Sequence, residues 1–195
     1  MNRRTLIKAG LLTAALFFAP SAHAETYHLY FLGGQSNMVG FGYNNELPAD
    51  LNKAVPNTRI FLGDPQNDFQ PAEGNGLWPT LTPGFGTGAR SDGESVATSN
   101  RFGPELAFAA HLQELRPGEH IAIIKYAKGG TSLDARQSRW GTWDPHDTRA
   151  GGPNKDQNPG INQYDHALAT IFNALRTEDI DNDGEPDTLI PAGIV

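Results

Sequence analysis

Four short runs of aliphatic and aromatic residues predict buried strands. Each run is too short for a typical helix, and two of them lead into paired glycines, as strands that end in tight turns do. The runs span residues 26–32, 58–62, 121–126 and 189–195.

Two other segments carry the spacing of helices. The first begins at Gly103-Pro104-Glu105, with proline at the position favoured for the first helical residue and an acid in the first turn, and is expected to end near Leu115. The second, at 161–175, is amphipathic. The stretches 63–100 and 131–160 are rich in glycine, proline and small polar residues, which predicts long surface loops of the kind that often carry function.

This order of elements predicts the fold class. Strands that alternate with helices indicate an α/β protein, here a three-layer α/β/α sandwich around a mostly parallel sheet. In such sheets, ligands bind beyond the carboxyl ends of the strands. Both glycine pairs, at 33–34 and 129–130, follow a predicted strand and therefore lie at such ends.

The first 24 residues have the composition of an export signal. Arg3, Arg4 and Lys8 precede a short apolar run, and Ala22-His23-Ala24 has the small-x-small pattern of a signal peptidase site. The apolar run is short for a membrane span, so we expect a cleaved signal peptide (1–24) and no stable membrane anchor. The paired arginines also resemble a twin-arginine signal. We expect one domain, 25–195, exported to the periplasm or out of the cell.

Charge and cysteine content exclude several function classes. The formal net charge is −7, and the leader contributes three positive charges and no negative ones, so the domain itself is more acidic still. Nucleic-acid binding needs clustered lysine and arginine, and is therefore not expected. The chain has no cysteine, which excludes disulfides, thiol nucleophiles and thiolate metal sites.

Ser36 is the clearest candidate for chemistry. It follows the first predicted strand in the string Gly33-Gly34-Gln35-Ser36-Asn37-Met38. A tight turn there lifts the serine out of the sheet beside backbone N–H groups, an arrangement suited to acyl transfer. A serine in this position is also a common helix cap, and the turn alone does not separate the two interpretations.

Three segments together resemble a known family. The strings GGQSNMVG (33–40), FGPELAFA (102–109) and KYAKGGTSL (125–133) are similar, in the same order, to the sialate O-acetylesterase and acetylxylan esterase group of SGNH hydrolases, which have a flavodoxin-like fold. The resemblance implies that Ser36 is the nucleophile and that its N–H is one oxyanion donor. Gly129 or Gly130 would supply another. A plain turn is the alternative for these two glycines, and spacing does not choose between them.

The resemblance also implies two segments that the sequence lacks. One is the DxxH segment that supplies the catalytic base, and the other is a W-x-Q-G segment whose glutamine completes the oxyanion hole. The chain ends inside the apolar run at 192–195, so we expect a sheet that is incomplete at the C-terminus and a truncated protein or gene fragment with little activity. Among the internal histidines, His146 is a minor candidate for the base, whereas His111 and His166 are expected at the surface or boundary of helices.

The loop at 131–160 contains candidates for carbohydrate contacts. Arg139, Trp140 and Trp143 lie there, and aromatic faces stack on sugar rings. Packing of a long loop by the two tryptophans is the alternative.

An acidic segment near the end of the chain resembles a calcium loop. Asp179, Asp181, Asp183 and Asp187 fall at positions 1, 3, 5 and 9, with a glycine at position 6. Position 12 is Ile190, which offers no ligand. A structural calcium and a solvated acidic turn both remain open. The resemblance implies that catalysis itself requires no cofactor.

We therefore expect a carbohydrate O-acetylesterase that works through an acyl-enzyme on Ser36, with O-acetylated carbohydrates as partners. The sugar, whether sialic acid, xylan or another, is not determined, because specificity lies in the loops. One alternative is a non-catalytic or degenerate carbohydrate-binding remnant of the same fold. Another is a related esterase acting on small or lipid esters.

Overall fold

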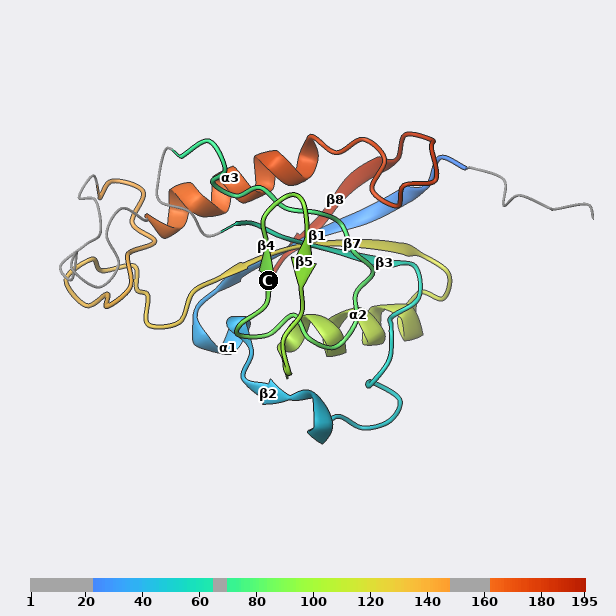
Figure 1. Cartoon of the computed structure of the whole chain (residues 1–195), viewed down its shortest axis with the longest axis horizontal. Coiled ribbons are helices and arrows are strands. Elements are labelled where there is room, and N and C mark those ends of the chain that lie inside the picture. Colours follow the sequence, from blue (N-terminus) through green and yellow to red (C-terminus); the bar gives the residue numbers. More distant parts are fainter. Residues whose placement is uncertain (1–22, 65–69, 148–161) are drawn as a thin grey trace, which may run out of the picture.

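A four-stranded parallel sheet forms the centre of the protein. The computed structural model describes residues 23–64, 70–147 and 162–195. The strand order is β3-β7-β1-β8, and every neighbouring pair is parallel (Figure 1). The strands are β1 (Thr26–Gly34), β3 (Thr58–Leu62), β7 (His120–Ala127) and β8 (Thr188–Ile194). All four predicted strands are confirmed, and the sheet is open rather than closed.

Helices cover both faces of this sheet. Helix α2 (Pro104–Leu115) lies on one face and α3 (Gln163–Leu175) on the other (Figure 1). The alternation of β7 explains the two layers, because successive side chains of a strand point to opposite faces. Ile121 and Ile123 join the cluster that contains Leu106 of α2, while Ala122 and Ile124 join the cluster that contains Ala174 of α3. The predicted α/β/α fold class is therefore confirmed.

Smaller elements lie between the main strands and helices. The one-turn helix α1 (Ser36–Val39) follows β1, and β2 (Gly42–Tyr43) pairs with β6 (Arg101–Phe102). Between them lie the 3-10 helix η1 (Asn44–Glu46) and a small hairpin of β4 (Arg90–Ser91) and β5 (Val96–Ala97). The predicted loop at 63–100 thus contains one short hairpin.

The signal-peptide prediction falls almost wholly on residues 1–22, which lie outside the described residues. Within the described part of the chain, no helix has both the length and the apolar character needed to cross a membrane.

One prediction about α3 is wrong. His166 was expected at the helix surface or boundary, but its side chain is fully buried. It packs against the ring of Tyr126 in β7, with 4.4 Å between ring centroids. The helical spacing of the apolar residues predicted which face of α3 packs on the sheet. That face also carries three buried polar residues, Gln163, His166 and Thr170. His111, by contrast, is exposed.

Candidate active site

Ser36 lies where β1 turns into α1, at the carboxyl edge of the sheet. Its side chain is half-buried, and its Oγ donates a hydrogen bond of 2.6 Å to Oε1 of Gln35. Gln35 is the N-cap residue of α1 but its side chain makes no capping bond. The serine is therefore held by its neighbour's amide and not used as a helix cap.

The two glycines after β7 have different surroundings. Strands β1 and β7 are adjacent, with Gly34 opposite Ala127, so the turn after β7 lies beside the turn after β1. A Cβ added at Gly129 would stand 3.6 Å from Cβ of Ser36. A Cβ at Gly130 would instead meet Cδ1 of Trp140 at 2.5 Å, and Gly130 has a φ of +74°. Gly129 is thus the glycine that borders Ser36, while Gly130 makes the left-handed turn under Trp140.

The N–H groups at this turn are available to a ligand. Within the described residues, no hydrogen bond uses the N–H of Ser36 or of Gly129. The turns that carry Ser36 and Gly129 are neighbours, and backbone donors beside a serine hydroxyl are the kind of groups that acyl transfer uses.

A cavity of about 380 Å³ opens beside α1. Its size is in the range of small-molecule sites. Gly129 and Trp140 line it together with the end of α1, the end of β3 and the segment 85–90. The walls combine apolar side chains with basic ones, namely Val39, Phe41, Leu62, Phe85, Arg90 and Lys128.

A second cavity, of about 540 Å³, adjoins the residues that precede Ser36. Gly34 and Gln35 line it, and so does Trp143, whose Nε1 donates to Oγ1 of Thr131 at 3.0 Å. The two predicted sugar-contact tryptophans are therefore on different cavities. Arg139 is exposed, and its guanidinium lies 5.3 Å from the centroid of the Trp140 ring.

The described histidines do not include a partner for Ser36. Among the described residues, Ser36 Oγ forms a hydrogen bond to Gln35 alone. His146 is exposed on its loop, where its N–H donates to Asp144 at 2.9 Å. His166 lies on the buried face of α3, and neither of its ring nitrogens makes a hydrogen bond within the described residues.

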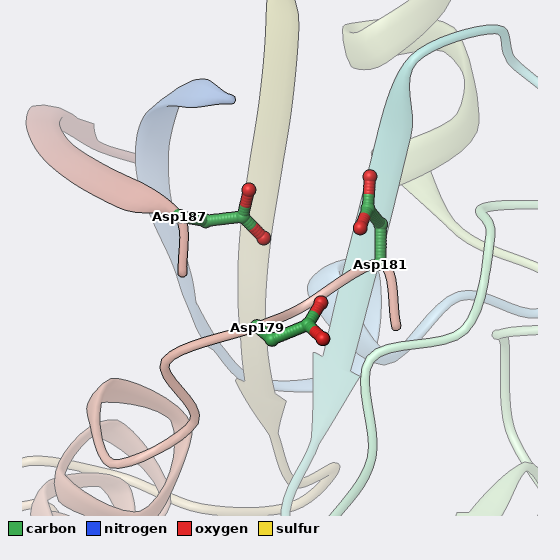
Figure 2. Close-up of side chains that lie close together, drawn as sticks. All are labelled: Asp179, Asp181 and Asp187. Carbon is green, nitrogen blue, oxygen red and sulfur yellow. The ribbon is translucent and has the colours of Figure 1, made fainter. Parts of the chain in front are cut away.

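Three of the four predicted calcium ligands are brought together. Asp179, Asp181 and Asp187 offer carboxylate oxygens that all lie within 4.8 Å of one another (Figure 2). Asp183 is outside this group, and the backbone N–H groups of His23 and Glu185 lower its pKa by hydrogen bonding to its carboxylate. The loop precedes β8, so it lies at the amino edge of the parallel sheet, opposite Ser36. Clustered carboxylates are hard oxygen donors, which fit calcium rather than zinc.

Sequence reasoning missed a buried ion pair close to the serine. Nζ of Lys125 lies 2.5 Å from Oε2 of Glu105, and both side chains are almost completely buried. The signal was present in the sequence, because a lysine inside the apolar run 121–126 has to find a partner when that strand is buried.

Comparison with known proteins identifies a family for this chain. A search of curated proteins gives no match. The family model described as "carbohydrate esterase, sialic acid-specific acetylesterase" matches residues 26–181, from the start of β1 to the acidic loop. That match spans most of the chain and contains Ser36, the Glu105–Lys125 pair and Gly129. The chain therefore belongs to the family of sialic acid-specific acetylesterases, a family of carbohydrate esterases.

Proposed function

We propose that the protein removes acetyl groups from O-acetylated sugars through an acyl-enzyme on Ser36. The observation that supports this most directly is the place of Gly129, which borders Ser36 closely enough that a Cβ on it would lie 3.6 Å from Cβ of the serine. Ser36 Oγ attacks the acetyl carbonyl carbon, and the N–H groups of Ser36 and Gly129 donate to the oxygen that becomes negative. The sugar leaves as an alcohol, and water then releases acetate and restores the serine.

The proton of Ser36 needs a base in this scheme. The family resemblance assigns that base to the histidine of a DxxH segment, whereas Gln35 holds the hydroxyl in the structure. Gln35 then orients Oγ before the reaction and does not take its proton, because a neutral amide is not basic at physiological pH.

The cavity beside α1 is the proposed binding place of the sugar. Trp140 offers an aromatic face there, with Arg139 next to its ring. Trp143 is proposed to contact substrate from the second cavity, on the other side of the nucleophile turn. No cofactor takes part in the chemistry.

Replacing Ser36 by alanine tests the assignment. Acetate release from O-acetyl sialic acid, acetylated xylan and an aryl acetate is measured on protein expressed from its natural reading frame. Ser36→Ala is expected to lower turnover by roughly 10⁴-fold or more, because the nucleophile is lost. Ser95→Ala is the control, since Ser95 is exposed and bonded to Asp92.

The same experiment separates the alternatives. Unchanged acetate release by Ser36→Ala contradicts the assignment of the nucleophile. A wild-type protein that binds acetylated sugars without releasing acetate supports the carbohydrate-binding remnant instead. Equal turnover of the aryl acetate and failure on both sugars supports an esterase of small esters.

We also propose that the protein is exported and that it binds a structural calcium ion. The leader is a cleaved signal that directs the protein to the periplasm or out of the cell. Its paired arginines would direct it to the twin-arginine route. In that calcium-rich setting the loop of Asp179, Asp181 and Asp187 holds a structural calcium, away from the reaction. The acidic charge gives the protein no affinity for nucleic acid.

A further inference from the structure

The buried pair of Glu105 and Lys125 has all its polar atoms in use. Nζ of Lys125 donates to Oε2 of Glu105 at 2.5 Å, to the carbonyl of Phe85 at 2.8 Å and to the carbonyl of Val39 at 3.0 Å. Oε1 of Glu105 accepts from the N–H of Gly103 at 2.9 Å. A lysine has three donors, so none is left over.

Such a network contributes more to position than to stability. Burial lowers the pKa of Lys125, while the charge of Glu105 opposes that shift. Desolvating two charges costs about as much as their attraction returns, so a buried ion pair adds little net stability over a well-packed apolar pair. Its hydrogen bonds, however, require the partner groups to lie at defined places.

The groups that the pair connects surround the nucleophile turn. Val39 is the last residue of α1, Phe85 is a wall of the cavity beside it, and Gly103 is the N-cap of α2. Gly40, directly after α1, packs so closely on Gly103 that a side chain there would overlap the Gly103 backbone. The pair thus joins the segments that carry the three family-like strings.

Helix α1 has few other means of staying in place. It is a single turn, contains no fully buried residue and has no side-chain cap at its N-terminus, although Met38 packs partly buried against the core. A helix this short is not stable by itself in water. The bond from Lys125 to the carbonyl of Val39 therefore fixes the C-terminal end of the helix that carries Ser36, next to the packing of Met38.

We propose that Lys125 and Glu105 are positioning residues that hold α1, and with it Ser36, against Gly129, and hold Phe85 at the cavity wall. This inference rests on the proposed role of Ser36 in ester hydrolysis. Neither residue touches the reacting atoms.

Paired substitutions separate positioning from stability. Lys125→Met leaves Glu105 buried without its partner, whereas the double variant Glu105→Gln/Lys125→Met removes both charges and is expected to recover thermal stability. Both variants still lack the donor to Val39 and Phe85. We therefore expect kcat for acetate release to stay about tenfold to a hundredfold below wild type in the double variant, with a smaller change in KM. Arg116→Met is the control, because it removes an exposed ion pair with Glu119 at the opposite end of β7.

A second measurement does not depend on activity. Glu105→Gln is isosteric, but whichever way its amide is turned, its NH₂ group faces a donor, either Lys125 Nζ or the N–H of Gly103. The amides of Val39 and Gly40 bond to the carbonyls of Gln35 and Ser36. We expect their hydrogen exchange to become about tenfold faster in this variant, relative to the amides of β7.

The outcomes distinguish the two proposals. A folded double variant with wild-type kcat, or unchanged exchange at Val39 and Gly40 in Glu105→Gln, overturns the positioning role. Retained acetate release in Ser36→Ala overturns the proposed function instead, and the exchange measurement then still reports whether the pair holds α1.

Discussion

Gly129 and Gly130 are adjacent in the chain but have different surroundings. A Cβ at Gly129 would meet Ser36 at ordinary van der Waals distance, whereas Gly130 has a positive φ and a Cβ there would overlap Trp140. A glycine pair after a strand is usually explained by the turn alone. Here the turn accounts for Gly130, whereas a Cβ at Gly129 would fit at ordinary contact distance from Ser36.

Alanine at Gly130 is expected to lower stability, whereas alanine at Gly129 is expected to lower activity. Gly130→Ala should lower the free energy of unfolding by about 1–2 kcal/mol from the left-handed backbone, and by more through Trp140. Gly129→Ala should leave the melting temperature nearly unchanged but reduce acetate release by about tenfold, because its methyl group takes up space beside Ser36. Thermal melts and an acetate assay measure both. The reverse pattern would make Gly130 the oxyanion donor.

At the level of elements, the two edges of the parallel sheet carry different chemistry. The carboxyl ends of β1 and β7 bear the serine and the glycine turn. The amino edge bears the acidic loop, where Tyr27 in β1 donates from its hydroxyl to Asp181 at 3.3 Å. Asp187 accepts from the N–H of Glu25, the residue before β1, at 3.0 Å. A calcium ion bound there would connect the start of β1 with the start of β8.

Calcium is therefore expected to stabilise the protein without taking part in catalysis. At a concentration about 100 times the dissociation constant, it should add about 2.7 kcal/mol to the free energy of unfolding. The measurement is the melting temperature in calcium against EDTA. Asp181→Asn should abolish the difference, while Asp50→Asn, at an exposed position, should keep it. Equal melting temperatures for the wild type in calcium and EDTA would favour the plain acidic turn.

Over the whole molecule, α3 docks on the sheet through polar as well as apolar groups. Tyr126 donates to Oε1 of Gln163 at 2.5 Å, and Nε2 of Gln163 donates to the carbonyl of Trp140 at 2.7 Å. His166 is a fully buried ionisable group in this interface. Burial lowers its pKa to about 4, and the charge of Lys128 acts in the same direction. The carboxylate of Glu73 lies 3.4 Å from Nδ1 of this histidine.

Folding stability should therefore fall in mild acid. An unfolded histidine has a pKa of about 6.5, so the unfolded chain binds the proton first as the pH drops. The contribution of neutral His166 to the free energy of unfolding is fully present above about pH 6.5. It is lost as the pH falls towards 4, which lowers that free energy by about 3 kcal/mol. Urea unfolding across this range measures it. His166→Leu should flatten the dependence, whereas His111→Gln, at an exposed site, should not. An equally steep dependence in His166→Leu would contradict this origin.

The strands, both long helices and the place of Ser36 follow from the sequence alone. The predicted strand at 58–62 and the helix from Pro104 to Leu115 agree with the structure to the residue. These features depend on alternation, helical spacing, proline and glycine, which act between residues near in the chain. The three family-like strings added the proposed role of Ser36 for the same reason, because each is a continuous segment.

Only the tertiary structure decided which residues meet. The parallel neighbours β1 and β7 place Gly129 rather than Gly130 beside Ser36. The packing of α2 brings Glu105 to Lys125, the docking of α3 buries His166, and the loop after β7 sends Trp140 and Trp143 to different cavities. Each of these contacts joins residues from different elements. They depend on strand order, register and helix docking, which are set by the packing of the whole core and leave no local pattern in the sequence.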